Sequence, residues 1–445
     1  MKVVGLVVAA LAGCLVAGCG ATHAQLGEES AVSERVGDSK DLLWAVIRDF
    51  RQQSSWASAS EVGARYERAC SGGDSLACEY RRWHRPEGAQ RSEALGPMRE
   101  ACEAGRAVGC LVVGWIQSQA YDFGSRPSED AGNPAEAATS VERGCRLGLQ
   151  RACVEWGRLF GYGVGVSEDP SRASALYEQA CEGGEMLGCS NLGWSHDHGR
   201  GVPKDPSLAN ELFGRACEGG EMMGCTNLGR SYNYGRGVPK DLGRASALYK
   251  QACDGGFMGS CMYLAVLYAN GLGVPMDSSR ACALYEQACD GGSMRGCNNL
   301  GRSYMHGLGV PKDPSLASAL YERACKGGEM MGCLNLGWSY NGGRGVPKDR
   351  SRAAALFQQA CDGGQMLGCT SVGSSYNYGW GVPKDPSRAA ALFQQACDGG
   401  QMVGCFNLGT SYENGAGVPQ DRSRANALFQ QACDSGVKDA CERVR

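Results

Sequence analysis

The spacing of the cysteines constrains the fold of this chain more than any other feature of the sequence. Apart from Cys14, Cys19 and Cys282, the 25 cysteines fall into pairs whose members are eight residues apart. From Cys145 to Cys433, the first member of each pair recurs every 36 residues without a slip. Such a period is the signature of an array of stacked structural repeats. The pairs are Cys70 with Cys78, Cys102 with Cys110, Cys145 with Cys153, Cys181 with Cys189, Cys217 with Cys225, Cys253 with Cys261, Cys289 with Cys297, Cys325 with Cys333, Cys361 with Cys369, Cys397 with Cys405 and Cys433 with Cys441.

Each repeat contains the pattern of two helices, which we call A and B, joined by a loop. In the unit at 365–400, Asp385 is a suitable N-cap and Pro386 a suitable first residue for helix B. Apolar residues follow at three- and four-residue steps in both segments. The Gly-x-Gly-Val-Pro-Lys-Asp segment between them cannot continue a helix. Gly399 and Gly400 predict a left-handed stop, and Met366 is expected to fill space under the preceding turn.

The repeat resembles the Sel1-like repeat, a relative of the tetratricopeptide class, and among these the Helicobacter cysteine-rich proteins. The resemblance rests on Asn-Leu-Gly-x-Ser-Tyr at 227–232, the Gly-Pro loop at 235–241 and Ala-Leu-Tyr-x-Gln-Ala-Cys at 247–253. A lone helix pair cannot bury its apolar face, so neighbouring units must stack. We therefore predict an all-α fold, a right-handed superhelical solenoid of disulfide-stapled helix-turn-helix repeats.

The beginning of the chain has the layout of an export signal. One lysine precedes a short apolar run, and Val16-Ala17-Gly18-Cys19 resembles a lipoprotein processing box. Cys19 is the preferred lipidation site, Cys14 is the other candidate, and an ordinary signal peptide is the alternative. We expect the protein in the periplasm, or at the outer membrane or cell surface, attached to the membrane through the lipid anchor only. The predicted divisions are a signal peptide at 1–18, a flexible spacer at 19–40, capping helices at 41–73, irregular repeats at 74–148, eight regular repeats at 149–436 and a C-terminal cap at 437–445.

The paired cysteines are expected to form disulfides. Each pair spans the short turn between helix B and the next helix A, which brings the two positions within disulfide reach. Zinc ligation is the alternative, but its usual Cys-x2–4-Cys spacing and second ligand pair are missing from the sequence. Cys282 occupies the position of Ser174 and Ala354 in other repeats, so we interpret it as an incidental free thiol.

Two positions in helix A are candidates for ligand binding. In solenoids of this type helix A usually lines the concave side, where a row of asparagines can hydrogen-bond an extended peptide. A second position changes between repeats and often holds Arg or Trp, the residue types that dominate binding hot spots. The alternative is that the asparagines pack between repeats and the changing position is solvated surface. The candidate groove residues are Asn191, Asn227, Asn299, Asn335, Asn407, Arg158, Trp194, Arg230, Arg302 and Trp338.

Composition and motifs argue against several functions. The net charge is −3 and the repeats contain no basic stripe, which argues against nucleic-acid binding. No cofactor is expected. The His196-Asp197-His198 triplet has aromatic residues at the same place in other repeats, so we do not predict a metal site.

The cysteine-rich family implies penicillin binding or weak β-lactamase activity. The sequence has one Ser-x-x-Lys motif, Ser435 to Lys438, in an inter-helix turn. The accompanying Ser-Asp-Asn and Lys-Thr-Gly motifs are missing, so no catalytic residue is predicted. The favoured function is an exported adaptor that holds a protein or peptide, or alternatively a cell-wall component, in its groove. A β-lactamase-like hydrolase and a passive structural envelope lipoprotein are the other interpretations.

Overall fold

The computed structural model describes residues 99–105, 107–118 and 133–444, and every regular element in these ranges is a helix. The predicted all-helical repeat fold is confirmed. A helices carry even numbers, and they are α6 (Ala107–Ser118), α8 (Gln150–Tyr162), α10 (Met186–His198), α12 (Met222–Tyr234), α14 (Met258–Asn270), α16 (Met294–His306), α18 (Met330–Gly342), α20 (Met366–Tyr378), α22 (Met402–Asn414) and the short α24 (Lys438–Cys441). B helices carry odd numbers, and they are α7 (Pro134–Arg146), α9 (Pro170–Glu182), α11 (Pro206–Glu218), α13 (Leu242–Asp254), α15 (Ser278–Asp290), α17 (Pro314–Lys326), α19 (Arg350–Asp362), α21 (Pro386–Asp398) and α23 (Arg422–Asp434).

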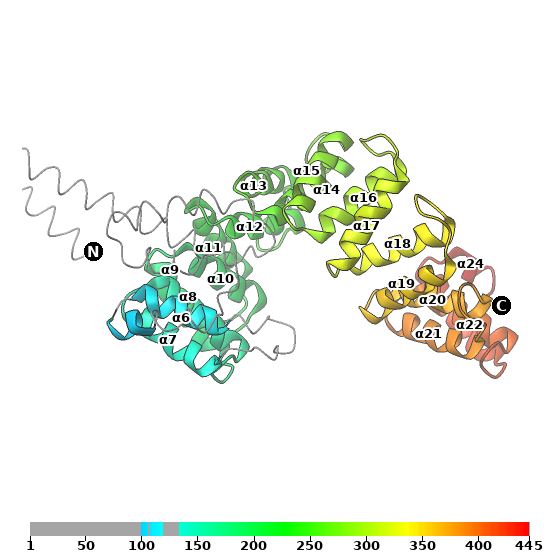
Figure 1. Ribbon diagram of the computed structural model, residues 1–445, viewed down its shortest axis with the longest axis horizontal. Helices are drawn as coiled ribbons and strands as arrows, with labels where there is room; N and C mark the ends of the chain where they lie inside the picture. The colour runs from blue at the N-terminus through cyan, green and yellow to red at the C-terminus, as the bar shows by residue number, and fades with distance from the viewer. Residues whose placement is uncertain (1–98, 106, 119–132, 445) are drawn as a thin grey trace, which may run out of the picture.

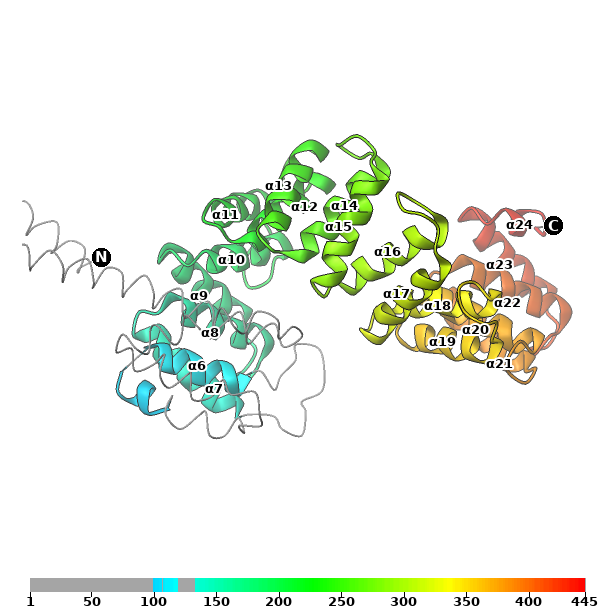
Figure 2. The same ribbon diagram turned by 45° about the horizontal axis from the view of Figure 1, so that its top comes forward.

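The helices form a single curved array. Each helix contacts the one before it and the one after it, so the chain order is also the spatial order. Figures 1 and 2 show the array running from α6 and α7 at one end, through α13 to α16, to α21 to α24 at the other. The core lies between the two helices of each repeat, where B-helix alanines and one buried aromatic ring face small residues of helix A. Phe357, for example, is 3% exposed and packs over Gly337.

The loop chemistry of the sequence explains where the helices begin and end. Asp385 accepts a hydrogen bond from the backbone N–H of Arg388, and Pro386 opens α21. Helix α20 ends at Gly379, whose φ of 71° lies in the left-handed region where glycine carries no steric penalty.

The two glycines after helix B have different roles, which corrects the prediction that both provide a left-handed stop. Gly400 has a φ of 82°, but Gly399 has an ordinary φ of −77°. A Cβ atom on Gly399 would lie 2.5 Å from Sδ of Met366, so this position must be small because a methionine lies against it. Met366 therefore packs under the following turn, not the preceding one as predicted.

Disulfides close the turns between repeats, as the cysteine spacing predicts. Ten of the eleven predicted pairs lie among the described residues, and all ten are bonded, with Cα atoms 4.5–4.7 Å apart. Many disulfides indicate an oxidising, extracytoplasmic environment. The bonded pairs are Cys102 with Cys110, Cys145 with Cys153, Cys181 with Cys189, Cys217 with Cys225, Cys253 with Cys261, Cys289 with Cys297, Cys325 with Cys333, Cys361 with Cys369, Cys397 with Cys405 and Cys433 with Cys441.

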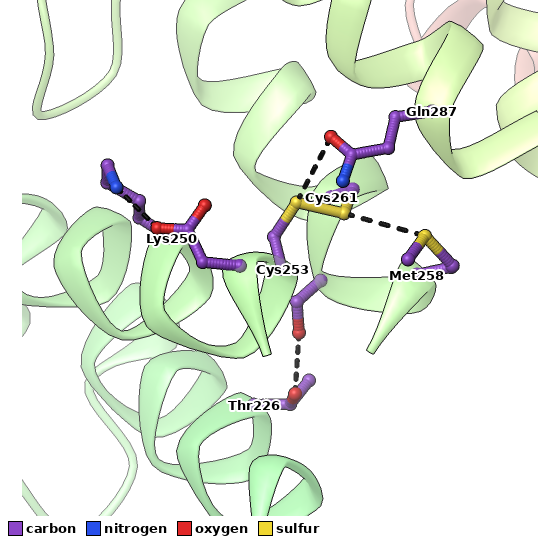
Figure 3. The surroundings of a disulfide bond; sticks show 8 residues. Thr226, Lys250, Cys253, Met258, Cys261 and Gln287 are labelled. Carbon is purple, nitrogen blue, oxygen red and sulfur yellow. Dashed lines mark hydrogen bonds and ion pairs between the residues drawn. A yellow bond between two sulfur atoms is a disulfide. The ribbon is translucent and has the colours of Figure 1, made fainter. Parts of the chain in front are cut away.

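One disulfide illustrates how the bond sits between repeats. Figure 3 shows the bond between Cys253 at the end of α13 and Cys261 in α14. Gln287 of the next repeat lies 3.8 Å from the sulfur of Cys253. The bond therefore contacts the following B helix as well as closing its own turn.

Cys282 is the one free cysteine among the described residues, and it is 2% exposed. Its sulfur lies 2.9 Å from the carbonyl oxygen of Leu308. Ser174 makes the same contact with the carbonyl of Arg200. The position thus tethers helix B to the loop of the next repeat.

Several predictions lie outside the described residues. They are the signal peptide, Cys19 and Cys14, the spacer, the capping helices at 41–73 and the disulfide between Cys70 and Cys78. Within the ranges that the structure covers, no helix is both long and apolar enough to cross a membrane.

Candidate functional site

The A helices form the inner layer of the curved array. Some helices also contact the helix two places along the chain, and the larger of these contacts are all between A helices. They join α6 with α8, α8 with α10, α10 with α12, α16 with α18 and α20 with α22. In a curved stack, the helices on the inner side approach each other more closely than those on the outer side. This places the A helices on the concave side, and binding at their candidate groove residues stays a prediction.

The predicted asparagine row is half-buried at every position. Asn191, Asn227, Asn299, Asn335 and Asn407 are all partly accessible to solvent. At one of them the structure shows a packing role, because Nδ2 of Asn335 donates to Oδ1 of Asn298 on the preceding A helix at 2.8 Å. Asn298 was missed in the sequence because its position, one residue earlier, holds no asparagine in the other repeats.

The changing position presents larger surfaces. Trp194 is 38% exposed and Trp338 is 45% exposed, while Arg302 is also exposed and Arg158 and Arg230 are half-buried. Both tryptophan rings are held from one side. Trp194 stacks on His198 with ring centres 4.3 Å apart, and Trp338 contacts Phe357 at 5.1 Å. Each ring thus has an aromatic neighbour and remains partly accessible to solvent.

A hollow of about 180 Å³ lies where α8, α9 and α10 meet. It brings together three predicted residues, Arg158, Asn191 and Trp194, and adds Tyr162, Tyr177 and Arg200. The guanidinium of Arg200 lies 5.7 Å from the ring centre of Tyr162 and 6.0 Å from that of Trp194. These are cation–π distances.

Two of the added residues, Arg200 and Tyr177, left only a weak signal in the sequence. Arg200 is the middle residue of a Gly-x-Gly loop, a position that varies between repeats as the Arg/Trp position does. Tyr177 alternates with phenylalanine at its position and so looks like an ordinary core residue. Only the stacking of repeats shows that both side chains reach the same hollow.

Carboxylates of the chain itself balance the charge of this hollow. Arg158 forms an ion pair with Glu155 at 2.8 Å, and Arg200 forms one with Glu168 at 2.9 Å. Buried Arg151 contacts Glu155 as well, at 3.6 Å. Burial raises the pKa of Tyr177 well above its ordinary value, so its hydroxyl stays protonated at alkaline pH values where an exposed tyrosine ionises.

The candidate metal and serine motifs are not assembled into sites. His196 lies 3.2 Å from the carbonyl of Pro203, His198 lies 3.0 Å from that of Trp194, and Asp197 pairs with Arg236 at 3.2 Å. Within the described ranges no three His, Cys, Asp or Glu side chains could hold a metal ion together. Ser435 is exposed in the turn after α23, where its hydroxyl donates to the carbonyl of Gln431.

A stacked array of two-helix units, each in contact with its neighbours along the chain, defines an α-solenoid repeat protein. The Sel1 repeat model matches residues 150–185, 187–221, 223–257, 259–293, 295–329, 331–365, 367–401 and 403–437, and the chain belongs to this family. Sel1 repeat proteins are generally protein-interaction scaffolds. No match was found among curated proteins.

Solved structures of repeat proteins are similar to parts or most of this chain. A protective antigen of uropathogenic Escherichia coli with an SLR fold is 23% identical over 86% of this chain and 89% of its own, with a TM-score of 0.47. A Sel1 repeat protein from Oxalobacter formigenes is 26% identical over 51% and 96% of the two chains, also with a TM-score of 0.47. Cysteine-rich protein B of Helicobacter pylori is 33% identical over 29% and 94%, with a TM-score of 0.25.

Proposed function

We propose that this protein is an exported scaffold that holds a segment of another protein against the inner row of its A helices. The observation that carries the proposal is the contrast within helix A. The cysteines and close-packed glycines recur from repeat to repeat, whereas one position, half-buried or exposed, changes between Arg, Trp and smaller residues. Constant positions maintain the stack, and a changing accessible position is where a repeat array encodes a partner.

The location of the scaffold forms part of the proposal. The disulfides require an oxidising compartment, and the sequence at Cys19 fits lipid attachment. We place the protein in the periplasm or on the cell surface, anchored by that lipid. Its partner would then be another exported or envelope protein, and a cell-wall component is the second class of ligand that the groove residues suit.

An in-cell crosslinking pull-down tests the proposal. The bait is the full-length protein, compared with the combined variant Arg230→Ala, Arg302→Ala and Trp338→Ala. A matched control replaces Glu211, Lys250 and Glu286, which are exposed on B helices, with alanine. We expect the native bait and the control to recover the same partner and the groove variant to lose it. Equal recovery by all three baits would refute the groove.

A further inference from the structure

Five residues that line the hollow between α8 and α10 occur a second time in the chain, while the positions of Gly161 and Tyr162 hold Met305 and His306 there. Moving each position by four repeats gives the same residue types in α16, α17, α18 and the loop after α18. The first set is Arg158, Tyr177, Asn191, Trp194 and Arg200, and the second set is Arg302, Tyr321, Asn335, Trp338 and Arg344. No other pair of neighbouring repeats between 149 and 436 holds all five residues.

The two sets share the framework around them. Arg151 forms an ion pair with Glu185 at 3.3 Å beside the first set, and Arg295 pairs with Glu329 at 3.5 Å beside the second. These four residues occupy equivalent repeat positions. The two sets therefore share one ion pair, which is buried beside the first set and has an exposed arginine, Arg295, beside the second.

The sets differ in the carboxylates that neutralise their arginines. In the first set, Glu155 pairs with Arg158 and Glu168 pairs with Arg200. The equivalent positions beside the second set hold Asn299 and Lys312. No carboxylate in the described part of the chain forms an ion pair with Arg302 or Arg344.

The A helices around the second set add no acidic side chain. The A helices α12, α14, α16, α18 and α20 contain no acidic residue. One repeat beyond the second set, the exposed rings of Tyr378 and Trp380 stack with centres 4.7 Å apart, and Arg350 lies 5.4 Å from the Trp380 ring. Aromatic and cationic groups thus continue along the array from Trp338.

We propose that the second set is a binding site for an acidic, aromatic-containing segment of a partner protein. Partner carboxylates take the places that Glu155 and Glu168 take in the first set, and an apolar side chain packs on the exposed part of Trp338. The first set is occupied by its own carboxylates and does not bind such a segment. The inference rests on the proposed scaffold function and specifies the chemistry of its ligand.

Charge-assisted hydrogen bonds from arginine to carboxylate are the strongest contacts such a site can make. They also carry orientation, because the guanidinium is planar and presents its donors in a fixed fork. The half-exposed tryptophan supplies apolar contact beside them. Binding should therefore weaken as salt is added, since the arginines are accessible to solvent.

The test transfers the carboxylates of the first set into the second. The variant Asn299→Glu with Lys312→Glu places internal partners beside Arg302 and Arg344 without altering any residue of the set. The matched control, Lys250→Glu with Gln394→Glu, makes the same change of net charge outside the candidate groove. Both control residues are exposed on B helices, Lys250 on α13 and Gln394 on α21.

The probe is a fluorescein-labelled peptide of Glu-Phe-Ser-Gly repeats, measured by fluorescence anisotropy against full-length protein, with a Lys-Phe-Ser-Gly peptide for comparison. We expect the Asn299/Lys312 variant to bind the acidic peptide at least about tenfold more weakly than the native protein, and the Lys250/Gln394 control to change by less than about threefold. Circular dichroism of both variants verifies that they fold.

Equal losses in the two variants would show a bulk charge effect and overturn the inference while leaving the scaffold function intact. No binding of the acidic peptide by the native protein, or equal binding of the lysine peptide, would also overturn the inference. The pull-down with the Arg230, Arg302 and Trp338 variant then decides separately whether the scaffold function stands.

Discussion

At the scale of single residues, the repeat depends on positions that have no side chain. Gly337 lies inside α18, where alanine would be favoured by about 1 kcal/mol on helix propensity alone. A Cβ atom there would lie 2.5 Å from Cε1 of Phe357. Overpacking a core of this kind costs about 1–3 kcal/mol, which outweighs the propensity gain.

We therefore expect Gly337→Ala to destabilise the protein by about 1–2 kcal/mol in urea unfolding. Gly214 provides the control, since it is also in the interior of a helix, α11, but has only Leu228 at 4.0 Å from its ideal Cβ. Gly214→Ala should raise stability by about 0.5–1 kcal/mol. Similar effects of the two substitutions would contradict the close-packing argument.

A second residue-scale prediction concerns Tyr249, whose ring is 1% exposed and whose hydroxyl is buried without a hydrogen-bond partner. Other repeats have phenylalanine at this position, for example Phe213 and Phe357. Tyr249→Phe should stabilise the protein by about 1 kcal/mol, because it removes a desolvated polar group. Thermal unfolding measures the change, and a lower midpoint would mean that the hydroxyl has a partner in solution.

Residue-level sequence reasoning succeeded where chemistry is local. Asp385 and Pro386 marked the start of a helix because capping needs only neighbours in the chain. The packing of Met366 was predicted wrongly because a repeat sequence does not say whether a side chain points to the unit before it or after it. The Gly399–Met366 contact joins two successive repeats, so only the stacked structure reveals it.

At the scale of helices and turns, each disulfide stabilises a very short loop. Closing a loop of eight or nine residues contributes about 2.5 kcal/mol in the chain-entropy model. Stability in a repeat array is close to a sum of local terms, so each bond should act mainly on its own neighbourhood.

Replacing Cys253 and Cys261 with alanine should therefore accelerate amide hydrogen exchange in α12 to α15 and leave α20 to α23 nearly unchanged. The expected local loss is about 2–3 kcal/mol. Exchange followed by mass spectrometry resolves the two regions. Uniform acceleration along the array would mean that the repeats unfold as one cooperative unit.

The candidate site was predictable only in part at this scale. Arg158, Asn191 and Trp194 were chosen from the changing and constant positions of helix A, and the structure places all three on one hollow. Arg200 was missed because it comes from a loop, and its reach across to the carbonyl of Gly161 depends on the stacking of repeats. The ion pair between Arg200 and Glu168 joins two successive repeats, so the sequence of one repeat could not predict it.

At the scale of the whole molecule, the same aromatic position recurs along the array and couples stability to pH. Burial raises the pKa of Tyr321 to about 12 and raises those of Tyr177, Tyr249 and Tyr285 as well. In an unfolded chain a tyrosine titrates near pH 10. The folded state therefore keeps protons that the unfolded state releases.

This difference fixes the sign of the pH dependence. Below about pH 10 both states are protonated and the tyrosines leave stability unchanged. As pH rises above about 10, the unfolded chain loses protons first, and stability falls by at most about 1.4 kcal/mol per buried group and pH unit until the folded groups also titrate. For Tyr321 that decline extends to about pH 12.

Urea midpoints measured at pH 8, 9, 10 and 11 should thus be level at first and then drop, with phenolate absorbance appearing together with loss of helical signal. Replacing Tyr177, Tyr249, Tyr285 and Tyr321 with phenylalanine should flatten the decline, because phenylalanine has no proton to lose. The fold should tolerate the change, since phenylalanine already fills this position in other repeats. An unchanged decline in that variant would assign the alkaline sensitivity to other groups. A flattened one would show that the buried rings of the array limit its stability at high pH.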